Sequence, residues 1–229
     1  MEQNKADYTI FTKPLEPYAP KRKLKHLRNG PSSYIVRNVT GGIYGRAYYS
    51  DAQFQKLYEE KVDIGEQNAQ HLKKVQEHGI NIPPTYFVAG TDSFNYLRLY
   101  SLTQEVKGYN LKTFVHLQNA NEEQLAASYN KLISSLCSYY ENQFWNNQMV
   151  MDDIADIHQY KIITDNEEPI IYLIDTDINI SEPCQNLAKD TINKLTNSAD
   201  ILSSKFRTGN NFMQPSYTAI DDLKLSIFS

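Results

Sequence analysis

The sequence predicts an α+β protein of two lobes, a small β-sheet lobe with one helix and a reduced, mostly helical lobe. Hydrophobic residues form 41% of the 229-residue chain, which is enough for a buried core. Short segments rich in β-forming residues fall in residues 34–103, and longer segments with helical periodicity fall in residues 104–229. Residues 1–33, which are rich in proline and carry a basic run, are expected to form an extended arm.

The first lobe is predicted to contain two β-hairpins and one helix. Glycines 41 and 42 form a two-residue turn signal between the first two β-rich segments. The helix is expected from Asp51, which follows a serine cap, to Glu77, and Gly79 ends it. The predicted strands are residues 34–40, 43–49, 85–89 and 94–101. Together these elements predict a small sheet with one helix packed on it.

The second lobe is predicted to be mainly helical after a linker at residues 102–110. Residues 122–145 carry one apolar stripe at helical spacing and follow a capping asparagine, Asn119 or Asn121. A short helix is expected at 111–117 and a longer one at about 184–206. The remaining tail is interpreted as loose, with apolar residues that could dock as a final short element.

An acidic hairpin at residues 149–180 is the most informative stretch of the chain. Two apolar strands, 160–164 and 170–174, flank a polar turn of five residues. Acidic residues precede the first strand (Asp152, Asp153, Asp156) and follow the second (Asp175, Asp177). Since an antiparallel hairpin brings these ends together, the carboxylates should meet beside the amide of Gln159. Oxygen ligands of this kind suit Mg²⁺ together with substrate phosphates.

Charge and cysteine content exclude several classes of protein. A net charge of −4 and a pI of about 5.7 argue against a general nucleic-acid binder. The two cysteines lack the CxxC spacing of a zinc site and do not suggest a disulfide framework. No apolar run approaches the 18 or so residues of a membrane span, and no signal-peptide pattern is present. A soluble, cytoplasmic protein is therefore expected.

Three stretches resemble protein-kinase motifs in their usual order. Residues 96–111 (YLRLYSLTQEVKGYNL) resemble a fifth strand and hinge, and 151–163 (MDDIADIHQYKII) resemble a divergent catalytic loop. Residues 170–177 (IIYLIDTD) resemble the strand that ends in the metal-binding Asp of the DFG motif. Over residues 34–200 the chain is most similar to divergent small bacterial protein-kinase-like proteins, a group of atypical kinases and pseudokinases. The resemblance implies a bilobal kinase-like fold.

The resemblance also implies ATP and Mg²⁺ as cofactors and gives roles to individual residues. Asp153 would be the catalytic-loop acid, with Asp152 and Asp156 as alternatives, and His158 beside them is expected to be structural. Asp175 would be the principal metal ligand, with Gln159 in place of the family's Asn and Asp177 as a further ligand. Nucleotide contacts would come from the backbone of Thr103, Gln104, Glu105 and Val106, from Arg46 at the phosphates, and from Glu60 as its helical partner, with Glu59 and Glu66 as rivals.

Several departures from the family pattern leave two functions open. The chain lacks the HRD sequence, the third-strand Lys and the Gly-rich loop, and the Asp153-to-Gln159 spacing is six rather than five. The first function is an atypical Mg-ATP-dependent phosphotransferase that acts on a protein or small-molecule hydroxyl, with nucleotidyl transfer as a weaker variant. The alternative is a pseudokinase that binds a partner protein, with or without nucleotide. The missing motifs favour the pseudokinase, and the crowded acids favour the enzyme, which is our primary prediction.

Overall fold

The computed structural model describes residues 7–10, 33–36, 43–48, 64–91, 97–114, 121–164, 168–174, 180–206 and 210–228. They form helices and small, mostly antiparallel sheets, which agrees with the predicted α+β class. The chain divides into two compact units, Met1–Lys73 with Ile82–Glu105 (unit 1) and Lys74–Asn81 with Val106–Ser229 (unit 2). Within the described ranges, no helix has the length and apolar character needed to cross a membrane.

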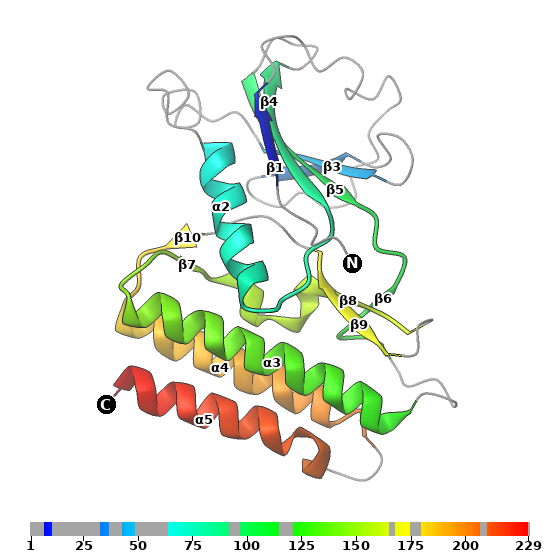
Figure 1. Cartoon of the computed structure of the whole chain (residues 1–229), viewed down its shortest axis with the longest axis vertical. Coiled ribbons are helices and arrows are strands. Elements are labelled where there is room, and N and C mark those ends of the chain that lie inside the picture. Colours follow the sequence, from blue (N-terminus) through cyan, green and yellow to red (C-terminus); the bar gives the residue numbers. More distant parts are fainter. Residues whose placement is uncertain are drawn as a thin grey trace. The chain divides into compact units, whose positions relative to one another are not determined.

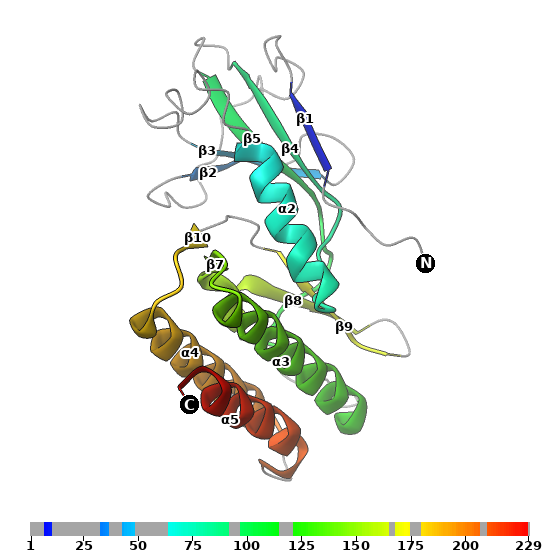
Figure 2. The same cartoon turned by 60° about the vertical axis from the view of Figure 1, so that its left-hand side comes forward.

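Unit 1 contains a five-stranded sheet with the order β1-β4-β5-β3-β2 (Figures 1 and 2). Both predicted hairpins are confirmed, because β2 pairs antiparallel with β3 and β4 pairs antiparallel with β5. The second strand of the second hairpin ends three residues later than predicted, and its predicted first three residues lie outside the described residues. The strands are β1 (Asp7–Ile10), β2 (Ser33–Val36), β3 (Ile43–Tyr48), β4 (Thr85–Thr91) and β5 (Leu97–Gln104).

The edge strand β1 corrects the expectation that residues 1–33 form only an extended arm. Asp7–Ile10 pairs parallel with β4, so that Asp7 lies opposite Tyr86 and Ile10 opposite Ala89. The edge of β4 offers unpaired backbone groups, and a short segment with β-forming Tyr8 satisfies them. A parallel pair is not joined by a tight turn, so no turn signal marks it in the sequence.

Helix α2 (Ile64–Glu77) ends where predicted. His78 N–H donates to Val75 O and Gly79 N–H to Gln76 O, and Gly79 has φ +86°, the left-handed conformation that glycine adopts at helix ends. The helix runs through Gly65, and the start predicted at Asp51 lies outside the described residues.

Three long helices, α3 (Glu122–Trp145), α4 (Gln185–Ser203) and α5 (Gln214–Phe228), lie side by side in unit 2 (Figures 1 and 2). Helix α4 runs opposite to α3 and α5 (Figure 1). The Asn121 side chain caps α3 by accepting bonds from the N–H groups of Glu123 and Gln124. The predictions of helices at 122–145 and 184–206 are therefore confirmed. The prediction of a loose tail is wrong, because α5 occupies most of it. The expected docking of its apolar residues as a final element is confirmed for Ile220 and Leu223, which α5 buries together with Ser216.

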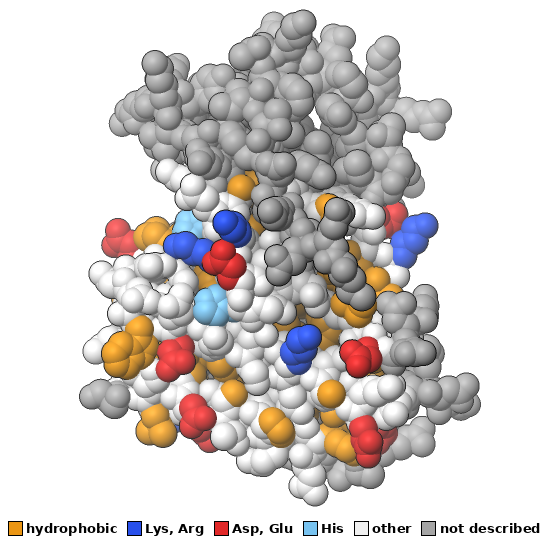
Figure 3. Space-filling model, viewed as in Figure 1, with side chains coloured by type: hydrophobic (Ala, Val, Ile, Leu, Met, Phe, Trp, Pro, Cys, Tyr) orange, Lys and Arg blue, Asp and Glu red, His pale blue; other side chains and the backbone are white. Residues whose placement is uncertain are grey.

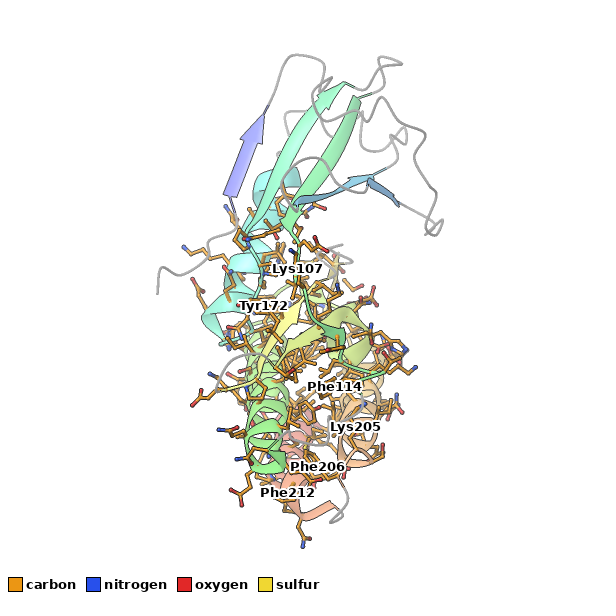
Figure 4. All side chains as sticks on the ribbon, turned by 90° about the vertical axis from the view of Figure 1, so that its right-hand side faces the viewer. Lys107, Phe114, Tyr172, Lys205, Phe206 and Phe212 are labelled. Carbon is orange, nitrogen blue, oxygen red and sulfur yellow. The ribbon has the colours of Figure 1, made fainter. Side chains whose placement is uncertain are left out.

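The end of α4 is tied to the turn at Leu111–Phe114. Lys205 Nζ donates to Lys112 O at 2.8 Å and to Phe114 O at 2.7 Å, and burial lowers the pKa of Lys205. The Phe206 ring centroid lies 5.3 Å from that of Phe212, and Figure 4 shows these two side chains close together in the lower part of unit 2. Of the predicted helix 111–117, the described residues 111–114 form a turn instead.

Two small sheets complete unit 2. Strand β8 (Tyr160–Ile163) pairs antiparallel with β6 (Tyr109–Asn110) and with β9 (Ile170–Leu173), which confirms the predicted hairpin. Strand β7 (Val150–Met151) pairs with β10 (Ile180–Ser181). On the face shown in Figure 3, charged side chains are spread among hydrophobic and uncharged ones, as expected of a solvated surface.

Gly108→Ala is expected to lower the free energy of unfolding by about 1–3 kcal/mol, the usual cost of added volume in a packed region. A Cβ at Gly108 would lie 2.5 Å from Ile162 O, so β6 and β8 would have to separate. Urea denaturation measures the change. Lys107→Ala, at the exposed neighbouring position, is the control and should change stability by less than about 0.5 kcal/mol. Equal stabilities of the two variants would contradict this close approach.

Candidate functional site

The predicted acidic site is built on residues 152–159, which connect β7 to β8. Two 3₁₀ helices, η1 (Asp153–Ala155) and η2 (Ile157–Gln159), make up most of this acidic segment. At its end, Ile174 N–H donates to Gln159 O at 2.8 Å. The hairpin thus brings Gln159 to the residue that immediately precedes Asp175 in the chain. Asp175 and Asp177 themselves lie outside the described residues.

Buried tyrosines fix the backbone of the acidic segment and of β7. Tyr140 Oη donates to Met151 O at 2.9 Å, and Tyr139 Oη accepts from Met151 N–H at 3.2 Å. Tyr160 Oη donates to Ile154 O at 2.7 Å. Burial raises the pKa of Tyr139 to about 12 and the pKa values of Tyr140 and Tyr160 well above the ordinary value, so the phenols stay protonated near neutral pH.

One face of α4 holds the other side of the acidic segment. Ser198 Oγ donates to Ala155 O at 2.8 Å. One turn earlier, Lys194 Nζ lies 2.9 Å from Asp190 Oδ2 and 4.0 Å from Asp153 Oδ1. Burial lowers the pKa of Lys194, but the bond to Asp190 and the nearby acids outweigh burial and raise it overall. Lys194 is therefore a fixed positive charge beside Asp153.

Asp152 is held by β10. Ser181 Oγ donates to Asp152 Oδ2 at 2.5 Å, while Asp152 Oδ1 is buried without a hydrogen-bond partner among the described residues. Burial raises the pKa of Asp152, and the Ser181 bond and the Lys194 charge oppose that rise only in part. A carboxylate with one oxygen engaged and the other buried is poorly placed to meet an incoming hydroxyl.

Asp156 is engaged with His158. Its carboxylate caps η2 by accepting from His158 N–H at 2.9 Å, and Asp156 Oδ1 also contacts His158 Nδ1. His158 Nε2 contacts Lys112 Nζ. Burial raises the pKa of Asp156, but the two hydrogen bonds with His158 and the charges of His158 and Lys112 outweigh burial and lower it.

Asp153 and Gln159 both lie in the acidic segment. The three acids of this segment differ in their surroundings. The side chain of Asp153 is 43% exposed and lies beside a cation, whereas Asp152 has one buried oxygen and Asp156 caps a helix. This geometry favours Asp153 as the acid that could meet a substrate.

The nucleotide-binding residues predicted for unit 1 are only partly described. Thr103 and Gln104 lie in β5, paired with β3 on one side, and Gln104 N–H donates to Pro84 O. Arg46 lies in β3 opposite Ser101, but its side chain is outside the described part, as is that of Glu66 in α2. Glu59 and Glu60 lie wholly outside it. The roles of these residues stay predictions.

At the end of the predicted adenine-binding stretch, Val106 is buried in unit 2. Its carbonyl oxygen accepts from Gly108 N–H and from Lys161 Nζ, each at 3.0 Å. Glu105 is the last residue of unit 1. Since this carbonyl already has two donors, it is saturated, and an adenine contact through it would have to displace one of them.

The described residues do not form a complete metal site. Within these ranges, no three His, Cys, Asp or Glu side chains are grouped so that they could hold a metal ion. The predicted Mg²⁺ site depends on Asp175 and Asp177, which lie outside these ranges. Carboxylate and amide oxygens would still suit Mg²⁺ chemically.

Sequence reasoning missed Lys112, Ser181 and Lys194. Lys112 is 46 residues from His158, and Ser181 is 29 residues from Asp152, so no local pattern connects them. The pair Asp156 and His158 does have a local signal. An aspartate two residues before another residue can accept a hydrogen bond from that residue's backbone N–H, as Asp156 does at the start of η2.

Comparison with known proteins does not assign this chain to a family. No protein-family model matches the sequence, and no curated protein is similar enough to be identified as a relative. The kinase-like interpretation therefore depends on the motifs and geometry of this chain alone.

Tyr160→Phe is expected to lower the free energy of unfolding by about 1–3 kcal/mol, because it leaves the buried Ile154 carbonyl without its donor. Tyr217→Phe is the matched control, since it removes an exposed hydroxyl that donates to Asp200 at 2.8 Å. It should cost about 0.5 kcal/mol or less. Urea unfolding compares them, and equal losses would argue against a special role for the buried hydroxyl.

Asp156 and Asp152 should give pH dependences of opposite sign. The folded-state pKa of Asp156 lies below 3.8, so its ionised form stabilises the fold above that pH, and this stabilisation disappears as pH falls through the folded-state pKa. The folded-state pKa of Asp152 lies above 3.8, so ionisation opposes folding, and stability falls as pH rises from 3.8 through that pKa.

Relative to the unmodified protein, Asp156→Asn should therefore be less stable at neutral pH and lose this deficit below about pH 4. Asp152→Asn should gain relative stability as pH rises above about 4. Unfolding free energies measured at a series of pH values test both slopes. Slopes of the same sign would show that one assignment is wrong.

Proposed function

We propose that the protein is an atypical kinase-like phosphotransferase that uses Mg-ATP and transfers a phosphoryl group to a hydroxyl of a protein or small molecule. The observation that carries this proposal is the hydrogen bond from Ile174 N–H to Gln159 O, at 2.8 Å. It closes the hairpin so that the acidic segment lies beside the residue that leads into Asp175. Phosphoryl transfer requires positioned charges more than covalent chemistry. In this proposal, the acids of the segment and the metal ligands would supply those charges.

The order of elements supports a bilobal kinase-like fold for this proposal. Unit 1, a sheet with part of α2, would correspond to the N-lobe, and unit 2 would correspond to a reduced C-lobe. In unit 2, α3 leads to β7, the acidic segment and the β8–β9 hairpin, which is the order expected of a catalytic loop followed by a metal-binding acid.

In this proposal, Asp153 orients the acceptor hydroxyl and takes its proton late in the transfer. Lys194, 4.0 Å from Asp153 Oδ1, holds that carboxylate in place. Asp175, Asp177 and Gln159 would hold Mg²⁺, which would neutralise charge on the phosphates. Arg46, with Glu60 as its partner, would contact the phosphates, and the backbone of residues 103–106 would contact adenine.

A pseudokinase that binds a partner protein is the second candidate. The observation that favours it is that each acid in the segment already has an intramolecular partner, Ser181 for Asp152, Lys194 for Asp153 and His158 for Asp156. Such pairing is what a stable scaffold without catalysis would need, because like charges crowded together otherwise oppose folding.

Thermal melting with Mg-ATP tests the proposed nucleotide site. A ligand at about 100 times its dissociation constant adds about 2.7 kcal/mol of stability, which is readily detected as a higher Tm. Asp175→Asn should reduce this shift while changing the ligand-free Tm little. Asp221→Asn, at an exposed acid on α5, is the control and should keep the shift. An unchanged shift in Asp175→Asn would refute the metal-ligand role.

Transfer itself is tested with Asp153→Asn. Its Mg-ATP melting shift should persist, while ATP turnover should fall by about 100-fold or more, the usual contribution of a positioned acid or base. If neither ATP, ADP nor Mg²⁺ shifts the Tm of the unmodified protein, the pseudokinase becomes the better explanation, and recovery of a partner protein would be the next test.

A further inference from the structure

Lys112, His158 and Asp156 form one continuous chain of polar contacts on the surface of unit 2. His158 contributes both ring nitrogens, Nδ1 to Asp156 Oδ1 and Nε2 to Lys112 Nζ. The side chains of His158 and Asp156 are 47% and 42% exposed. The three side chains come from two places in the fold, the turn after β6 and the 3₁₀ helix η2.

The partners of the His158 ring match one of its two neutral tautomers. The Asp156 carboxylate is an acceptor only, so it pairs with a proton on Nδ1. The Lys112 ammonium is a donor only, so Nε2 must offer its lone pair. In this tautomer a carboxylate lies behind Nδ1, and the Nε2 lone pair becomes a nucleophile once the Lys112 ammonium turns away from it.

The backbone around these side chains is fixed. Asp156 accepts from His158 N–H at 2.9 Å, which sets the spacing of acid and ring. Lys112 N–H donates to Asn110 Oδ1 at 3.0 Å, and Lys112 O accepts from Lys205 Nζ at 2.8 Å. A group held in this way loses little orientational freedom when it reacts.

We propose that His158 is a phosphorylation site of this protein, with Nε2 as the acceptor and ATP as the donor. The proposal rests on the proposed function for its donor. The Nε2 lone pair attacks the γ-phosphorus, the Nε2–P bond forms, the β,γ-bridging P–O bond breaks, and ADP leaves with that electron pair. The Nδ1 proton stays hydrogen-bonded to Asp156, whose carboxylate balances the charge of the ring. The Lys112 ammonium turns its donors from Nε2 to the phosphoryl oxygens.

The position of His158 favours this assignment over His78. It directly precedes Gln159, which is bonded to Ile174 beside the predicted metal ligand Asp175. His78, by contrast, contacts the Ser138 hydroxyl at 3.0 Å and packs edge-on against the Tyr139 ring. A hydroxyl does not balance ring charge as a carboxylate does, so His78 is the matched control.

The first experiment uses phosphoramidate, a small phosphoryl donor that reacts with histidine without a nucleotide site. The folded full chain is incubated with it, and phosphohistidine is located by mass spectrometry at alkaline pH. We expect His158 to be labelled at least about 10-fold faster than His78, and Asp156→Asn to reduce its labelling about 10- to 100-fold through loss of a charge-assisted hydrogen bond. Equal rates at His158 and His78 would overturn the proposal, whatever the nucleotide experiments show.

The second experiment uses Mg-ATP labelled at the γ-phosphate. An acid-labile, base-stable label on His158 is expected, lost in His158→Gln and kept in His78→Gln, with the melting temperature of each variant as the check on folding. A Tm shift with Mg-ATP but no label on His158 would overturn the proposal and leave the nucleotide site intact. Selective phosphoramidate labelling without any Mg-ATP shift would overturn ATP as the donor, and with it the proposed function.

Discussion

The acidic segment depends on side-chain hydroxyls that take the place of a regular hydrogen-bond ladder. Strand β7 has two residues and η1 has three, so neither can satisfy most of its own backbone groups. The phenols of Tyr140 and Tyr160 and the hydroxyl of Ser198 donate to carbonyls of this stretch instead. Since unpaired buried carbonyls are costly, these bonds confine the segment to one path and set where each acid emerges.

The pairing of the acids follows from that path. β10 brings Ser181 to Asp152, and α4 brings Lys194 to Asp153. Each carboxylate therefore has its own donor or cation, which offsets the repulsion between neighbouring negative charges. The pKa directions agree with this, because Asp152, with one oxygen buried, is raised and Asp156, with an imidazole partner, is lowered. These pairings of each acid with a donor or a cation are the central electrostatic feature of the segment.

The sequence predicted the elements whose signals are local. The β8–β9 hairpin had two apolar runs around a polar turn, and α3 had both an apolar stripe and Asn121 as its cap. The end of α2 was predicted at Gly79, where φ is +86°. In each case the chemistry that determines the structure lies within a few residues.

Elements fixed by distant partners were missed or misplaced. β1 is defined by its parallel pairing with β4, and β7 by its pairing with β10. Neither pair is joined by a tight turn, so no turn residue in the sequence indicates the pairing. The sequence predicts a loose tail where α5 forms, with five apolar residues that could dock (Ile220, Leu223, Leu225, Ile227 and Phe228). Only Ile220 and Leu223 of these are buried, at helical spacing, while Leu225 is 68% exposed. The same limit applies to the site, since Lys194 and Lys112 reach the acidic segment from elsewhere in the chain.

A break between the two 3₁₀ helices explains how one short segment carries two charge arrangements. In a continuous 3₁₀ helix, residues three apart eclipse each other, so Asp153 and Asp156 would face the same neighbours. Asp156 instead has an extended backbone, with φ −90° and ψ 122°, which ends η1 and starts η2 in a new direction. Asp153 therefore lies beside Lys194 on α4. Asp156 contacts His158, whose ring in turn contacts Lys112. An acid beside a cation and an acid–imidazole–cation chain can then coexist three residues apart, because the fixed backbone keeps them from exchanging partners.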